Sequence, residues 1–236
     1  MKNDPAFKLL AAIIIAGVAA CLLAPTSNAA ESGAAKPKHS RTRTGTYQNS
    51  NGGSGTVNST TTSGGGERTR DTTLTNQDGK TATHTSDRTW DKSTGTGTVN
   101  SSSTGFNGRT TSRQGTLTKN DDGTVSGAGT ITGPKGGTST YAQTTSKTDT
   151  GRTTTGTVTG PNGQTGTYSN TVSHTAPGTV NRTSTVTGPQ GKTTEREVAR
   201  QVNADGSGTR TIQVTKPDGT VETRTETFQV TPTPTP

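Results

Sequence analysis

Residues Thr153–Tyr168 read TTTGTVTGPNGQTGTY, and this stretch contains the pattern that decides the fold. Threonine at alternate positions is typical of a β-strand, because threonine is β-branched and because side chains in a strand alternate with period two. The sequence Pro161-Asn162-Gly163 in the middle of the stretch is typical of a tight turn. The stretch therefore predicts two strands joined by a reversal of the chain, which is a β-hairpin.

The same pattern recurs along the chain about every 28 residues. The glycines that follow a turn-forming residue are Gly79, Gly108, Gly136, Gly163, Gly191 and Gly219, with successive spacings of 29, 28, 27, 28 and 28. Gly52 lies 27 residues before Gly79 and opens a degenerate first copy. A second set of turns is predicted 15 or 16 residues after each of these glycines, at Gly95, Gly123, Gly151, Gly178 and Gly206. The chain is thus expected to reverse about every 14 residues.

Two positions in each repeat keep a fixed phase relative to the turn glycine. Five residues before the glycine stand Leu74, Ser103, Ile131, Val158, Val186 and Val214. Five residues after it stand the large side chains His84, Arg113, Tyr141, Tyr168, Arg196 and Arg224. Aliphatic residues are scarce in this chain, so their regular recurrence favours a folded repeat with an apolar seam, and large residues are suited to lie across a neighbouring strand.

The composition argues against an ordinary globular core. Of the 236 residues, 58 are threonine and 32 are glycine, whereas hydrophobic residues make up 21% and aromatic residues 3%. Only 22 large apolar residues follow Glu31, which is too few to compensate the ordering of about 200 residues in a packed two-layer domain. We therefore expect an all-β chain in which tandem hairpins form an extended antiparallel meander or thin sheet, partly disordered. A β-solenoid and a largely disordered chain are the alternatives.

The N-terminus is predicted to be an export signal. Lys2 and Lys8 form a basic region, and the apolar run Leu9–Ala24 follows it. Cleavage is expected after Ala29, so that the mature chain begins at Ala30. Val18-Ala19-Ala20-Cys21 resembles a bacterial lipobox, so lipidation of Cys21 is an alternative, and an uncleaved anchor is another.

The predicted organisation has four parts. A signal peptide covers residues 1–29, and a flexible basic arm covers residues 30–46. The Thr/Gly-rich β-repeat region covers residues 47–230. Residues 231–236 form a Thr-Pro tail, for which an extended polyproline conformation is expected.

The sequence offers little catalytic chemistry. The three histidines are His39, His84 and His174, and none has a second histidine or a cysteine at the spacing of metal ligands. The many hydroxyl groups lack an adjacent base held by a third group. The aspartates lie mostly in predicted turns, and their tendency to hydrogen-bond to the nearby backbone is sufficient to explain why they occur there. We therefore predict no enzyme activity and no catalytic residue, cofactor site or metal site.

These observations predict an exported, non-enzymatic protein with a structural, spacer or adhesive role at the bacterial envelope or outside the cell. The net charge of +8 suggests an alternative, a binder of anionic polymers such as lipopolysaccharide, acidic polysaccharide or extracellular DNA. The basic residues that support it include Arg109, Arg113, Lys119, Lys135, Lys147, Arg152, Arg182, Lys192 and Arg196. A second copy of the same chain is the other expected partner, through self-association. A third class is an ice- or surface-binding protein, although Arg43, Arg113, Arg182 and Arg224 interrupt the threonine rows in the sequence.

Overall fold

A computed structural model describes residues 38–233, and within this range the chain forms fourteen strands and no helix. The strands are β1 (His39–Asn49), β2 (Ser54–Gly64), β3 (Glu67–Asn76), β4 (Thr81–Asp91), β5 (Thr96–Thr104), β6 (Thr110–Lys119), β7 (Val125–Thr132), β8 (Thr138–Thr148), β9 (Gly151–Thr159), β10 (Thr165–Ala176), β11 (Thr179–Thr187), β12 (Thr193–Val202), β13 (Ser207–Thr215) and β14 (Val221–Thr233). The predicted all-β class and the run of hairpins are confirmed.

Every strand pairs antiparallel with its neighbours in sequence, and β14 pairs with β1. The sheet therefore closes into a barrel, and the expected open meander or thin sheet is wrong, as is the parallel solenoid. Closure has a physical reason, because an open sheet of this length would leave two long edges with unpaired backbone groups. Pairing β1 with β14 over ten residues satisfies both edges.

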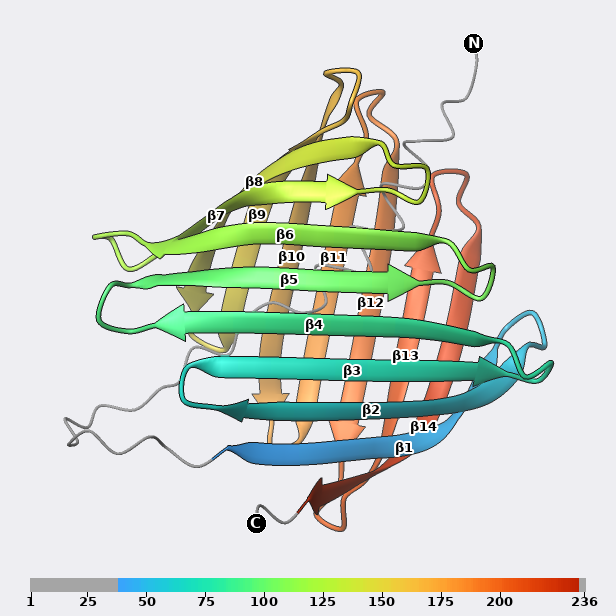
Figure 1. Ribbon diagram of the computed structural model, residues 1–236. Helices are drawn as coiled ribbons and strands as arrows, with labels where there is room; N and C mark the ends of the chain where they lie inside the picture. The colour runs from blue at the N-terminus through green and yellow to red at the C-terminus, as the bar shows by residue number, and fades with distance from the viewer. Residues whose placement is uncertain (1–37, 234–236) are drawn as a thin grey trace.

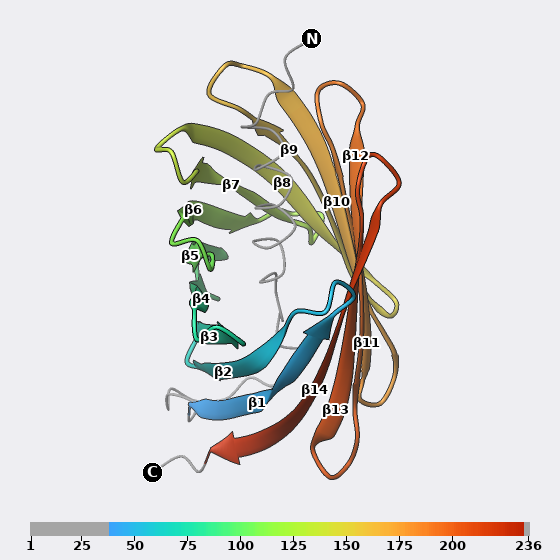
Figure 2. The same cartoon turned by 90° about the vertical axis from the view of Figure 1, so that its right-hand side faces the viewer.

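The barrel is flattened into two layers (Figures 1 and 2). Strands β2–β6 form one layer, and strands β9–β13 run crosswise behind it. The chain passes between the layers at β7 and β8 on one side and at β1 and β14 on the other (Figure 2). Crossed layers of this kind are an established way of packing two sheets, with bent strands at the corners.

The predicted turn glycines lie in the turns that join successive strands, as expected, with one exception. Gly163 has a φ of +76°, a conformation that other residues rarely adopt, and its amide donates to the carbonyl of Gly160 at 2.9 Å. Gly151 is the exception, because it begins β9 and the reversal is made by Asp149 and Thr150.

Side chains alternate between an inner and an outer face, and the inner face holds the apolar residues. Val158 and Val186 of the predicted seam are only 1% and 3% exposed. The seam is not the only apolar contact, however. Further buried apolar residues outside that phase are Val57, Val99, Leu117, Tyr141, Tyr168, Val172, Val198, Ile212 and Phe228. The interior is thus built from sparse apolar residues together with polar ones.

Aromatic rings on the inner face lie over glycines of neighbouring strands. A Cβ atom on Gly156 would come within 2.7 Å of the Tyr168 ring, and one on Gly115 within 1.9 Å of the Tyr141 hydroxyl. Many glycines inside strands therefore make room for a large side chain, as expected where a backbone or ring approaches closely.

Both ends of the barrel region differ from the sequence prediction. Residues 39–46 belong to β1 and pair with β2 and β14, so this part of the predicted flexible arm is a strand. Thr42, Thr44 and Thr46 supply its alternation. Residues 231–233 of the predicted tail extend β14 along β1. Pro232 is tolerated there because the pairing of β14 with β13 has already ended at Gln229.

Candidate functional site

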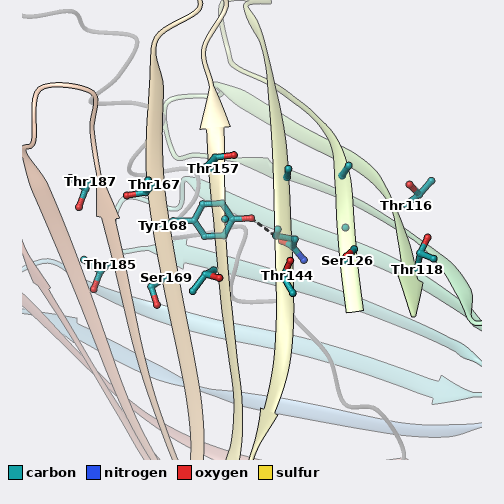
Figure 3. A pocket seen from close by; sticks show the side chains of 16 residues that line it. Thr116, Thr118, Ser126, Thr144, Thr157, Thr167, Tyr168, Ser169, Thr185 and Thr187 are labelled. Atoms are coloured by element: carbon teal, nitrogen blue, oxygen red, sulfur yellow. Dashed lines mark hydrogen bonds between the residues drawn. The ribbon is translucent and has the colours of Figure 1, made fainter. Parts of the chain in front are cut away.

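The outer face carries an uncharged trough across β6–β11, with a volume of about 820 Å³ (Figure 3). We call it the threonine trough. Two rows of outward side chains form its floor. The first row is Thr116, Ala128, Ala142, Thr157, Thr167 and Thr187, and the second row is Thr118, Ser126, Thr144, Thr155, Ser169 and Thr185. Ten of these twelve residues carry a hydroxyl group, and none is charged.

Strand register aligns the two rows. Thr157 lies directly opposite Thr167, and Thr155 lies directly opposite Ser169, so successive hydroxyls stand side by side on adjacent strands. Because strands are spaced about 4.8 Å apart and alternate residues about 6.7 Å, six strands present a lattice that extends about 24 Å along the curved sheet. The trough is therefore a regular array of hydroxyl groups.

The trough is supported from the inner face by a polar contact. The hydroxyl of Tyr168 donates to Oε1 of Gln143 at 2.9 Å, which Figure 3 shows, and Nη2 of Arg113 donates to the same oxygen at 2.9 Å. The Arg113 guanidinium also lies 4.0 Å from the centre of the Tyr141 ring. These contacts link the alternate strands β6, β8 and β10 on the inner side of the sheet that carries the two rows.

The inner face carries a second cluster, which we call the arginine cluster: Arg43, Arg70, Arg196, Arg200, Arg210, Arg224 and Glu226. Glu226 is 1% exposed. Its carboxylate lies 3.0 Å from Nη1 of Arg43, 3.2 Å from Nη1 of Arg210 and 2.8 Å from Nη2 of Arg224. One carboxylate thus serves three guanidinium groups from β1, β13 and β14.

The environment shifts the pKa values of these groups. Burial opposes ionisation of Glu226, but Arg210, Arg224 and Arg43 together outweigh it and hold the pKa of Glu226 below its ordinary value. Burial and neighbouring arginines lower the pKa values of Arg70, Arg196 and Arg200 to about 10. These guanidinium groups still carry their charge at neutral pH.

Charge is segregated between the two faces. Twelve arginines lie on the inner face: Arg41, Arg43, Arg68, Arg70, Arg88, Arg113, Arg152, Arg182, Arg196, Arg200, Arg210 and Arg224. Glu226 is the only buried acid among residues 38–233. The nine other lysines and arginines and the thirteen other acids in this range lie on the outer face, in turns or at strand ends. The outer surface therefore carries slightly more negative than positive charge.

The inward placement of the arginines bears on two functional alternatives, binding of anionic polymers and binding of ice. Arg113, Arg152, Arg182 and Arg196, which were expected to attract anionic polymers, lie on the inner face and not on the surface. The four arginines that interrupt the threonine rows in the sequence, which include Arg43 and Arg224, likewise point away from the outer face.

The sequence-predicted histidines are not brought together. Nδ1 of His84 lies 2.7 Å from Oγ of Ser103, and burial together with Arg70 holds the pKa of His84 below its ordinary value, with Asp71 offsetting this in part. Within residues 38–233, no group of three or more histidines, cysteines or acids is arranged to hold a metal ion. Cys21, Ala29 and Ala30, the predicted lipidation and cleavage residues, lie outside the described residues.

Sequence reasoning missed both the trough and the arginine cluster. The signal for the cluster was present, because its members Arg196 and Arg224 share the repeat position of Tyr141 and Tyr168. The signal for the trough was the Thr-x-Thr alternation, but only the barrel register shows which hydroxyls align.

Comparison with known proteins gives no match: no family model, no curated protein and no solved structure matches this chain. In the part of the chain that the structure describes, no helix is long and apolar enough to span a membrane.

Proposed function

We propose that this protein is an exported binding module whose threonine trough binds an extended, neutral polyhydroxylated polymer, such as a polysaccharide chain of the envelope or extracellular matrix. The observation that carries the proposal is the pair of aligned, uncharged hydroxyl rows that line the trough. This is an adhesive role, and a closed barrel suits it better than the role of an extended spacer.

The shape and chemistry of the trough favour a chain-like ligand. The trough is two rows wide and six strands long, so it matches a polymer lying across the strands. Hydroxyl groups both donate and accept hydrogen bonds, which suits a ligand that also carries many hydroxyls. Ala128 and Ala142 leave space on the floor where larger side chains would obstruct the polymer. No lining residue is an acid, a base or a histidine, so the trough supports binding and not catalysis.

Binding to insoluble polysaccharides tests the proposal. Ala142→Gln places a larger side chain in the trough and is expected to reduce binding at least 10-fold. Ala199→Gln is the matched control, because Ala199 is an exposed, outward residue of β12 outside the trough. Binding should change little with salt, because neither face of the contact is charged. Equal binding by both variants, or a steep loss of binding with salt, would contradict the proposal.

Ice is the second candidate ligand. One observation favours it: the arginines that interrupt the threonine rows in the sequence point inward and leave an uncharged array outside. Ice is a less favoured ligand than a polymer, because the trough is concave and an ice plane needs a flat binding surface. Thermal hysteresis that is present in the wild type and lost in Ala142→Gln would favour ice over the polysaccharide.

A further inference from the structure

The arginine cluster holds more positive than negative charge. The arginine cluster contains six guanidinium groups, and Glu226 is the only buried acid in residues 38–233. Glu226 is already shared among Arg43, Arg210 and Arg224. The remaining guanidinium groups of the arginine cluster have no buried carboxylate of their own.

Strand register places like charges opposite one another. Arg200 on β12 lies directly opposite Arg210 on β13. Arg70 on β3 interacts unfavourably with Arg210 and Arg200 of the other layer. Directly opposed like charges destabilise a sheet, so this arrangement calls for a compensating negative charge.

Buried donors in the same place also lack acceptors. Nη1 of Arg196 and Nε of Arg200 are buried and have no hydrogen-bond partner among the described residues. Guanidinium groups remain protonated in proteins, so these donors cannot be satisfied by losing a proton. A buried charged donor without an acceptor is costly, and an oxygen-rich anion would remove that cost.

We propose that the arginine cluster binds a small multivalent oxyanion between the two layers, with inorganic phosphate as the simplest representative. Arg70, Arg196, Arg200 and Arg210 would provide the donors. Guanidinium groups suit this ligand because their planar fork matches two oxygens of a phosphate or sulfate group. The site faces inward, so it is independent of the threonine trough and of the function proposed for it.

The test is phosphate binding by the mature protein, measured by calorimetric titration and by thermal unfolding at constant ionic strength. Phosphate is expected to bind saturably and to raise the unfolding temperature of the wild type. Arg200→Gln should weaken phosphate binding at least 10-fold. This variant is expected to fold, because it removes the like charge opposite Arg210. Arg109→Gln removes the same charge from an exposed turn and should bind as the wild type does.

Several outcomes would overturn the proposal. Wild-type protein that shows no saturable phosphate binding by titration excludes the site directly, whatever the variants do. Equal loss of binding in Arg109→Gln and Arg200→Gln would show a diffuse charge effect. Binding of dextran sulfate without binding of phosphate would assign the interaction to the outer surface, which a polymer can reach. If Arg200→Gln does not fold, Arg196→Gln replaces it with the same expectation.

Discussion

Tyr141 on β8 and Val158 on β9 lie directly opposite each other on the inner face, and both are almost fully buried, at 4% and 1% exposure. Tyr141 stands five residues after one turn glycine and Val158 five residues before the next. The same relationship joins Tyr168 to Val186 and Arg113 to Ile131. The 28-residue period therefore places a residue of one copy directly opposite a residue of the next copy, and this pair recurs on the inner face along the sheet.

Replacing Val158 by Asp should destabilise the barrel by at least about 3 kcal/mol, because the change removes an apolar contact and buries a charge. Thr159→Asp should cost less than about 1 kcal/mol, since side chains one position away point to the outer face. Urea unfolding followed by circular dichroism measures both values. Similar losses of stability in the two variants would mean that Val158 does not face a packed interior.

The glycines beneath the aromatic rings give a second prediction. Gly156→Ala should cost about 1–3 kcal/mol, because the new Cβ would lie 2.7 Å from the Tyr168 ring and 2.4 Å from the carbonyl oxygen of Ala142. Gly160→Ala is the control, as its nearest contact is 3.6 Å and its φ is not in the left-handed region. Thermal unfolding of the two variants should separate them by several degrees. Equal unfolding temperatures would refute close packing of ring on glycine.

Much of the fold was predictable because local signals determine it. The Thr-x-Thr alternation and turn glycines such as Gly163 define the hairpins, and antiparallel pairing follows from short turns. Closure was not predictable, since it depends on β1 meeting β14 about 180 residues away, and no local pattern encodes that contact. The sites were missed for another reason. Arginine is usually exposed, so charge was assigned to the surface, whereas the repeat phase of Arg113 and Arg196 placed them inside.

Glu226 gives a prediction on pH. Its pKa is lowered in the folded state, so its contribution to stability is complete above the ordinary value of 4.5 and is lost as pH falls below that value. Glu226→Gln should lower stability at neutral pH by about 3 kcal/mol or more, because it leaves Arg43, Arg210 and Arg224 without their carboxylate. Below pH 4.5, the free energy of unfolding should fall less steeply in Glu226→Gln than in the wild type, because the variant has no carboxylate to protonate at this position.

The control for this experiment is Glu197→Gln, in which an exposed outer-face acid is neutralised. Its stability should follow that of the wild type across the whole pH range. Unfolding by urea at a series of pH values measures all three proteins. A neutral-pH stability of Glu226→Gln equal to that of the wild type would show that the carboxylate does not hold the three arginines.

Closure of the barrel can be tested with a disulfide between β1 and β14. Thr46 and Thr227 are directly opposite on the outer face, and their Oγ1 atoms lie 3.2 Å apart. Directly opposite residues on antiparallel strands have the Cα separation that a disulfide needs. In the chain from Ala30 onward, which contains no other cysteine, Thr46→Cys with Thr227→Cys should therefore form an intramolecular disulfide on oxidation. Because it closes a loop of about 180 residues, it should stabilise the fold by up to about 5 kcal/mol.

Thr46→Cys with Thr223→Cys is the matched control. Thr223 lies four residues from Thr227 along β14, so its Cα is about 13 Å further along the strand and beyond the reach of a disulfide. Gel mobility under non-reducing conditions and size-exclusion chromatography distinguish the products. A closed barrel gives a cross-linked monomer for the first pair alone. An open sheet would bring β1 of one molecule against β14 of another and give cross-linked multimers, and that result would refute closure within one chain.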